Sequence, residues 1–584
     1  MVTVHKSALK FFTQSLVWMR KEFSCNVGPI RHSFVNMQEH PRKETKEKRS
    51  NFPLAIILTA YCVLLLPFLR FVPFWDGASY FVCMMNAVRA ATFSLPNFQC
   101  DGHFSTVYLL MLSVTQYLDF GNVTLVHLLN IFIGCGGIWA VSTIVRFVHR
   151  NQHDALSLWL ITAVYAFMPL AVSHALQLNL DFPVMSFFAM FLACLLRGYR
   201  VGAVLAGIAM IFSKETGAVV YMGTTALFVL HQIARKHGTI REMSRKATQY
   251  IYLGIPFVIL VVYYTTFKFI SNHDLTWYGT SPKDALSTAF DLNMYDEGIR
   301  AMLFDIFVLN FNWIPSVFIV VFLLQRLFKL VLKPLPTTDN AGVTMRTHIL
   351  LFCLLLTAVY IVTRVRPWNN ARYILVAYPA LVVCFSIALH ALIRSKIVRH
   401  TILVCLLLLL ILSNFRTIDP VSKRVFHTFK FGSHEMLDMS LMIGPRWSRR
   451  DQLVYNFEFT KLFELERRIF RDIQPTRSTV ILTGAYGVFL MPANVDDTTF
   501  EPTLRRDSTI PLLMFDSQGD MTPEKLGKKL KPGDHFYFTE YPIFENTEVF
   551  SYLMKQYPLV EKKTYDIGGY TAGLYTFRLP PPAL

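Results

Sequence analysis

Long apolar runs recur along the first two thirds of the chain, and no other feature constrains its fold as strongly. The first run is "FPLAIILTAYCVLLLPFLRFV" at 52–72, and others follow as far as Phe415. A helix crosses a bilayer with about 20 apolar residues. Hydrophobic residues make up 53% of the 584 residues and charged residues only 16%, which is low for a soluble protein. The runs therefore predict a polytopic α-helical membrane protein.

Basic clusters between the runs predict how the chain is threaded through the membrane. They start at Arg146, Arg197, Ala234, Gln325 and Arg394, and links rich in Lys and Arg stay in the cytoplasm. The net charge of +18 therefore indicates cytoplasmic loops and not a nucleic-acid partner. About 11 spans are expected, near 52–72, 123–145, 155–176, 182–197, 201–213, 217–234, 250–270, 302–324, 347–363, 373–392 and 397–414.

This threading leaves a set of links on the outer side of the membrane. The outward links are 74–103, 173–181, 213–217, 271–300 and 364–372. The alternation holds only if the apolar stretch 104–118 does not cross completely. Because this stretch is short for a span, we interpret it as an incomplete or re-entrant segment.

The two ends of the chain differ from the apolar part at 51–415. Residues 1–50 are polar and basic and lack the compact apolar core of a signal peptide, so they indicate a cytoplasmic tail. Residues 416–584 have ordinary polarity and the size of a domain. The expected elements there are strands at 478–484 and 534–542, a helix ending at Pro558 and a terminal β-hairpin. We predict a soluble α/β domain, which the span count places outside.

Three arginines interrupt the apolar sequence at "IVTRVRPWNNARYILVAYP" (361–379), in an outward link. Arg364, Arg366 and Arg372 are the one prominent exception to the positive-inside pattern. A guanidinium near the membrane needs a partner or water, and it grips phosphate with paired hydrogen bonds. Phosphate binding is one interpretation, and snorkelling toward ordinary lipid headgroups is the other.

Two carboxylates lie at the ends of apolar runs. Asp76, in "PFWDGASYF", follows the first run among aromatic side chains that include Tyr80. An acid held there loses hydration, and this makes it a candidate for a functional site. Asp181, in "LQLNLDFPVMSFF", precedes another run and could cap that helix, serve the site, or do both.

Two further pairs of ionisable residues lie in the outward links. Lys214 and Glu215, in "FSKETGAVV", are most simply a self-neutralising pair at a tight turn. Asp101 and His103, in "CDGHF", are too few to indicate a metal site.

Taken in order along the chain, these motifs resemble the GT-C glycosyltransferases. The resemblance covers roughly 50–415 and rests on an Asp after the first span, a His before the next apolar segment, "LDFP", "SKETG" and "ARYILVAYPAL". It is nearest to the protein O-mannosyltransferases, the aminoarabinose lipid A transferases and the rhizobial lipid A sugar transferases. Many of these carry Asp-Glu in the first loop and His-Pro-Pro or Lys-Pro-Pro later. Here Gly77 follows Asp76 and Phe104 follows His103, so the acceptor and a divalent metal requirement stay open.

The resemblance implies transfer of a sugar from a polyprenyl-phosphate donor to a glycan, lipid or protein acceptor outside the membrane. Asp76 would accept the acceptor's proton. Arg372 would meet the charge that grows on the leaving phosphate, with support from Arg366, Arg364 or Tyr373. Asp181 is a second candidate catalytic acid that would position the acceptor or orient Asp76. Other candidates for substrate positioning are Tyr80, Asp101, His103, Lys214 and Glu215. The chain has no GxxxxGK[ST] loop, in agreement with a reaction that uses no nucleotide.

Other classes of protein fit the same composition less well. A flippase or transporter of lipid-linked sugars would be expected to show internal repeats, and we see none. A non-catalytic lipid-binding subunit is the second alternative. An ion channel is disfavoured because no span carries a repeated polar stripe. The expected location is the bacterial inner (plasma) membrane, with the endoplasmic reticulum as the alternative.

Overall fold

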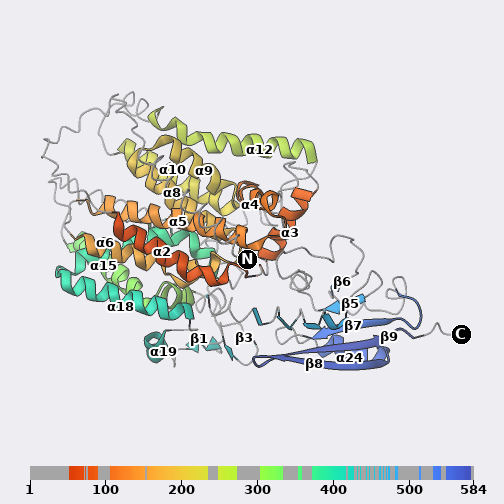
Figure 1. Cartoon of the computed structure of the whole chain (residues 1–584). Coiled ribbons are helices and arrows are strands. Elements are labelled where there is room, and N and C mark those ends of the chain that lie inside the picture. Colours follow the sequence, from red (N-terminus) through yellow and green to blue (C-terminus); the bar gives the residue numbers. More distant parts are fainter. Residues whose placement is uncertain are drawn as a thin grey trace. The chain divides into compact units, whose positions relative to one another are not determined.

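A computed structural model describes most of the apolar part of the chain and selected stretches of the rest. The described residues are 51–71, 73, 76–89, 106–150, 154–234, 248–271, 303–332, 353–354, 356–357, 371–415, 419–426, short stretches between 430 and 514, 530–540 and 547–580. Up to 426 the structure is helical (Figure 1). Its elements are α2 (Phe52–Leu65), η1 (Leu66–Phe68), α3 (Asp76–Arg89), α4 (Thr106–Leu118), α5 (Val123–Val148), α6 (Ala155–Ala166), α7 (Pro169–His174), α8 (Asp181–Arg197), α9 (Arg200–Ile211), α10 (Glu215–Ala234), η3 (Thr248–Gly254), α12 (Ile255–Ser271), η5 (Asp305–Asn310), α15 (Trp313–Leu332), η6 (Ala371–Ala377), α17 (Tyr378–Leu392), α18 (Lys396–Phe415) and α19 (Pro420–Phe426).

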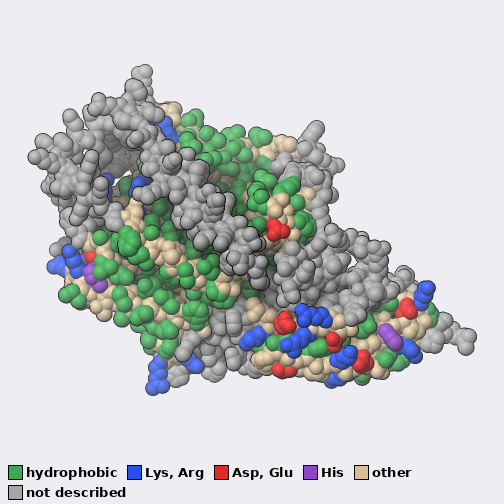
Figure 2. All heavy atoms as spheres, in the orientation of Figure 1, with side chains coloured by type: hydrophobic (Ala, Val, Ile, Leu, Met, Phe, Trp, Pro, Cys, Tyr) green, Lys and Arg blue, Asp and Glu red, His purple; other side chains and the backbone are tan. Residues whose placement is uncertain are grey.

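The helices have the length and surface of membrane-embedded helices. Among the described residues, three are long and apolar enough to cross a bilayer: Val123–Val148, Arg372–Leu392 and Lys396–Phe415. Seven shorter apolar helices accompany them. Large hydrophobic side chains such as Val258 on α12 and Leu408 on α18 are more than half exposed, at 62% and 55%, and Figure 2 shows hydrophobic side chains spread over this helical part. Such a surface is stable against lipid tails and not against water.

Two of the predicted spans are wrong in detail. The run 155–176 is not one helix, because α6 ends at Ala166 and α7 begins at Pro169. Met168 is extended (φ −61°, ψ 122°), as expected for a residue before proline. In the run 302–324, a π-helical turn and Asn312, with φ +74°, precede α15.

The structure tests two other predictions about the spans only in part. The stretch 104–118 forms α4, whose 13 residues reach about 20 Å, less than a bilayer core of about 30 Å, so its short length agrees with an incomplete segment. The span at 347–363 lies mostly outside the described residues, and the total number of spans stays a prediction.

Helices α5 and α8 form the centre of the helical part and lie side by side (Figure 1). Their close approach depends on two glycines of the "GCGG" stretch of α5. A Cβ at Gly134 would lie 2.9 Å from the ring of Phe182, and one at Gly137 would lie 3.2 Å from Cα of Ser186. Small residues at such crossings allow helices to pack closely in membranes.

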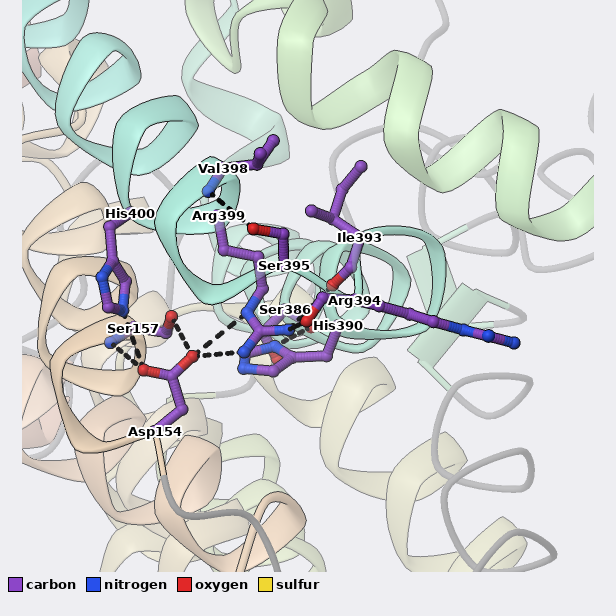
Figure 3. Close-up of polar contacts among 10 residues, drawn as sticks. All are labelled: Asp154, Ser157, Ser386, His390, Ile393, Arg394, Ser395, Val398, Arg399 and His400. Atoms are coloured by element: carbon purple, nitrogen blue, oxygen red, sulfur yellow. Dashed lines mark hydrogen bonds and ion pairs between the residues drawn. The ribbon is translucent and has the colours of Figure 1, made fainter.

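A buried polar cluster joins α6, α17 and α18 (Figure 3). Asp154 caps α6 and accepts bonds from Ser157, from His400 Nε2 at 2.8 Å and from Arg399 Nη2 at 2.5 Å. Burial raises the pKa of the Asp154 carboxyl, but these hydrogen bonds outweigh it and hold that pKa well below its usual value. The cluster is built from ion pairs whose remaining polar atoms are also bonded, such as Arg399 Nη1 to the carbonyl of Ile393 at 2.7 Å.

The last part of the chain contains a five-stranded mixed sheet in the order β6-β5-β7-β9-β8. Its strands are β5 (Val480–Thr483), β6 (Leu512–Met514), β7 (His535–Glu540), β8 (Leu559–Ile567) and β9 (Tyr570–Arg578), and α24 (Thr547–Gln556) accompanies them. Strand β5 is parallel to β6 and β7, and β9 is antiparallel to β7 and β8. Two short hairpins, β1 (Lys430–Phe431) with β2 (His434–Glu435) and β3 (Met442–Ile443) with β4 (Arg446–Trp447), precede the sheet.

The predicted elements of the C-terminal part are therefore present. The strands expected at 478–484 and 534–542 correspond to β5 and β7, and the expected helix is α24. The terminal hairpin turns at Gly568 and Gly569, whose φ angles of +61° and +88° suit the tight turn between β8 and β9. That 416–584 form a separate domain outside the membrane stays a prediction.

Candidate active site

The structure brings the first-loop acid into contact with the late arginine. Arg372, at the start of η6, donates from Nη2 to Oδ2 of Asp76, in the first turn of α3. These residues are 296 positions apart in the sequence. The Asp76 side chain is 43% exposed and the Arg372 side chain only 10%, so the carboxylate lies at an accessible edge and the guanidinium lies behind it.

A second ion pair lies directly beside the first. Lys214 Nζ donates to both carboxylate oxygens of Asp181, at 2.9 and 2.8 Å. Nε of Arg372 lies 3.7 Å from Oδ2 of Asp181, so Arg372 lies between the two acids. Asp181 and Lys214 have 3% and 5% exposed side chains. Their contact with each other offsets the large cost of burying either charge alone.

The ring of Tyr373 lies against both cations. Lys214 Nζ is 4.8 Å from its centroid, and Cζ of Arg372 is 5.4 Å away. Both distances lie within the range of cation–π attraction, which grows stronger where water is excluded. The aromatic face therefore helps to keep two positive charges close together.

This group of residues can perform acid–base and anion chemistry. Asp76, Asp181, Lys214 and Arg372 supply two negative and two positive charges. The carboxylate of Asp76, at the accessible edge of the group, is placed to accept a proton from a bound hydroxyl. The forked guanidinium can exchange this carboxylate for a phosphate oxygen.

The remaining predicted site residues fall into two sets. Tyr80 is buried (3% exposed) on α3, one turn after Asp76, and Glu215 is buried (8%) as the first residue of α10. The others, Arg364, Arg366, Asp101 and His103, lie outside the described residues.

Two local interpretations need correction. Asp181 does not cap α8, because Leu180 holds the cap position and Asp181 lies in the first turn. A self-neutralising pair with Glu215 does not account for Lys214, because its ammonium group reaches 33 residues back to Asp181. The contact with Asp181 offsets the cost of burying the ammonium group of Lys214.

A buried polar network behind Asp181 was not expected from the sequence. Asn179 Oδ1 accepts from the Asp181 amide at 3.0 Å, and Asn179 Nδ2 lies 2.7 Å from Nδ1 of His174. Gln177 Nε2 donates to Ser173 Oγ at 2.8 Å. In "HALQLNLD" (174–181), polar and apolar residues alternate from Gln177 to Asp181, and this pattern was the sequence signal for the network.

No metal site is evident among the residues that the structure describes. No three His, Cys, Asp or Glu side chains within them are arranged to hold a metal ion. The question of a cofactor stays open, because Asp101 and His103 lie outside these residues.

Comparison with solved structures identifies the fold. The chain matches ArnT from Cupriavidus metallidurans, in a crystal structure bound to undecaprenyl phosphate, with a TM-score of 0.51 over 90% of this chain and 98% of that chain, at 13% identity. The chain has the GT-C fold. In this GT-C fold the candidate site lies where the starts of α3 and α8, the link between α9 and α10, and η6 meet.

Other comparisons add less. Apo ArnT from the same organism matches at 12% identity and a TM-score of 0.49, with the same coverage of 90% and 98%. The arabinofuranosyltransferase AftD from Mycobacteria matches at 13% identity and a TM-score of 0.43, over 91% of this chain and 40% of that chain. No protein-family model matches the chain, and no curated protein sequence is significantly similar to it.

Proposed function

We propose that the chain is a glycosyltransferase of the membrane that moves a sugar from a polyprenyl-phosphate donor to an acceptor hydroxyl on the extracytoplasmic side. The observation that carries the proposal is the position of Arg372 between Asp76 and Asp181. Asp76 is accessible and Asp181 is buried, so a guanidinium placed between them can hold a phosphate next to the accessible carboxylate of Asp76.

The proposed reaction uses the accessible carboxylate of Asp76 and the guanidinium of Arg372 behind it. The acceptor oxygen attacks the anomeric carbon of the sugar, and a new C–O bond forms as the bond between that carbon and the phosphate oxygen breaks. The bonding electrons leave with the polyprenyl phosphate, which changes from a monoanion to a dianion. Asp76 takes the proton of the acceptor hydroxyl, a role that contributes about 100- to 10,000-fold. Arg372 stabilises the added negative charge on the phosphate.

The buried residues are proposed to support Asp76 and Arg372. Asp181 and Lys214, at 3% and 5% side-chain exposure, are proposed to hold Arg372 and Tyr373 in place. Asp181 also remains a proposed second catalytic acid that orients Asp76 or positions the acceptor, and Lys214 remains a proposed substrate-positioning residue. Arg364 and Arg366 remain proposed phosphate ligands. Tyr80, Asp101, His103 and Glu215 remain proposed substrate-positioning residues.

The fold supports this assignment. ArnT, whose fold the chain shares, has been crystallised with undecaprenyl phosphate, a lipid of the class that our donor would release. The large exposed apolar surface agrees with a place in a membrane. The bacterial inner membrane is the proposed location, the C-terminal part is proposed to lie outside it, and the acceptor is a glycan, lipid or protein.

Replacement of Asp76 by Asn tests the proposal. Asp76→Asn should lower kcat by about 100- to 10,000-fold and should still bind the donor, since the amide keeps the shape of the side chain. Asp119→Asn is the matched control, because Asp119 is a carboxylate outside the site that accepts a bond from Asn122. Initial rates with a synthetic polyprenyl-phosphate sugar and a donor-binding assay decide the matter. Unchanged turnover in Asp76→Asn would contradict the role of Asp76 as the base. Donor binding without any sugar transfer by the wild type would favour a flippase or a non-catalytic lipid-binding subunit.

A further inference from the structure

A row of residues along one face of α5 contacts the segments that lead to Asp76 and Asp181. The row consists of His127, Asn130, Gly134 and Gly137, whose spacing of three, four and three residues places them on the same face of a helix. Gly134 and Gly137 let α8, which begins with Asp181, approach closely. His127 and Asn130 are fully buried polar residues at the end of the row nearest the start of α5.

His127 holds the segment that leads to Asp76. Its Nε2 lies 2.7 Å from the backbone carbonyl oxygen of Phe71. Because a carbonyl oxygen only accepts, Nε2 carries the proton and donates it. Phe71 is itself buried and lies between η1 and α3, so this bond attaches the entrance to α3 to the α5 scaffold.

Asn130 holds the segment that leads to Asp181. Its Nδ2 donates to the carbonyl oxygen of Ala175, the residue that ends α7, at 2.8 Å. Its Oδ1 accepts from the hydroxyl of Tyr108 on α4 at 3.0 Å. The hydroxyl of Tyr108 therefore orients the amide of Asn130, and that amide holds the backbone at Ala175.

The two held segments also touch each other. A Cβ at Gly77, next to Asp76, would lie 2.0 Å from the carbonyl oxygen of Gln177, so only glycine permits this approach. Leu178, the next residue, has a φ of +51°, a left-handed conformation that a leucine rarely adopts. Local structure of this kind persists only where the surroundings enforce it, and the bond from Asn130 to Ala175 is one such constraint.

We infer that His127 and Asn130 are positioning residues, which set the separation of Asp76 and Asp181 so that one guanidinium, that of Arg372, reaches both. Two bonds from one helical turn of α5 reach the backbone of two different segments, and each segment ends in one of the acids. The consequence for turnover rests on the proposed function, whereas the effect on backbone order does not.

Hydrogen–deuterium exchange and kinetics on the full chain test this inference together. His127→Leu removes the donor to Phe71, and His127→Gln keeps an N–H that can replace it. Asn130→Leu removes the donor to Ala175, while Tyr108→Phe removes only the bond that orients Asn130. The matched control is His149→Leu, since His149 is equally buried at the other end of α5 and bonds Ser386 at 3.1 Å.

The expected result is local and distinguishes the two segments. His127→Leu should speed exchange in peptides covering 69–80, and Asn130→Leu should do so in peptides covering 173–182, each by about tenfold or more. Because a misplacement of about 1 Å can cost 100-fold, kcat should fall by about 10- to 100-fold with little change in the donor KM. His127→Gln should recover most of both effects, and His149→Leu should show neither.

Unchanged exchange in both peptides, or a fall in kcat no larger than that of His149→Leu, would overturn the inference. The inference and the proposed function fail separately. If the wild-type chain transfers no sugar, the proposed function fails, and the exchange data still decide whether His127 and Asn130 hold the two segments.

Discussion

Replacement of Arg372 by lysine separates the geometry of this side chain from its charge. The guanidinium donates from Nη2 to Asp76 while its Nε lies 3.7 Å from Asp181. A lysine keeps the positive charge but has a single nitrogen, which cannot serve both acids and a phosphate. A hydrogen bond to a charged group contributes about 1.5–3 kcal/mol, and about 1.4 kcal/mol corresponds to tenfold in rate. Arg372→Lys should therefore lower kcat/KM by about 10- to 150-fold.

The assay measures initial rates of sugar transfer across a range of donor concentrations, together with the melting temperature of each variant. Arg399→Lys is the matched control, because Arg399 is a buried arginine that bonds Asp154 by Nε at 3.1 Å and Nη2 at 2.5 Å, away from Asp76. This control should lose stability and keep kcat/KM. The reasoning would be refuted if Arg372→Lys retained wild-type kcat/KM, or if both variants lost activity only in proportion to their loss of stability.

Three other variants test separate parts of the account. Asp181→Asn alone should lower the free energy of unfolding by about 3–5 kcal/mol in denaturant titrations, because it removes the carboxylate that pairs with Lys214. Adding Lys214→Met should recover part of that loss. Additive losses in the double variant would contradict this. The partners of Asp154 hold its pKa below the usual value, so its contribution to stability should be complete above about pH 4 and should be lost as the pH falls toward the folded pKa. The melting temperature of Asp154→Asn should therefore fall less on acidification than that of the wild type. Equal falls in the two proteins would contradict this. Gly77→Ala should lower kcat by more than about tenfold, because the added Cβ would clash with the carbonyl oxygen of Gln177. Gly198→Ala should only reduce the melting temperature, because Gly198 has a φ of +74° but open space around it. Equal kcat values in these two variants would contradict this.

The contact between Asp76 and Arg372 could be predicted because it depends only on topology. The predicted alternation of spans puts the first and the late outward links on one side of a membrane, and the charged residues of such links are expected to gather in polar sites. The partner of Lys214 could not be predicted in this way. Glu215 is its neighbour in the sequence, and only the packing of α8 near α10 brings Asp181 closer to its ammonium group.

The helix boundaries could likewise be predicted only in part from the sequence. Hydropathy located the apolar runs, but it averages across Met168 and Pro169, where a change of backbone direction splits one predicted span into α6 and α7. The roles of His127 and Asn130 were also hidden. A buried histidine or asparagine inside an apolar run shows that a polar partner exists, and only coordinates reveal that the partners are the carbonyl groups of Phe71 and Ala175.

The most direct test of the central claim is to identify the lipid that co-purifies with two variants. Mass spectrometry of Asp76→Asn should detect a polyprenyl-phosphate sugar, because this variant holds the donor's phosphate but cannot complete the transfer. Arg372→Met should lose that lipid and keep the ordinary membrane lipids around its apolar surface. If the two variants carried the same glycerophospholipids and no sugar-linked polyprenyl phosphate, the assignment of Arg372 to the donor phosphate would be wrong.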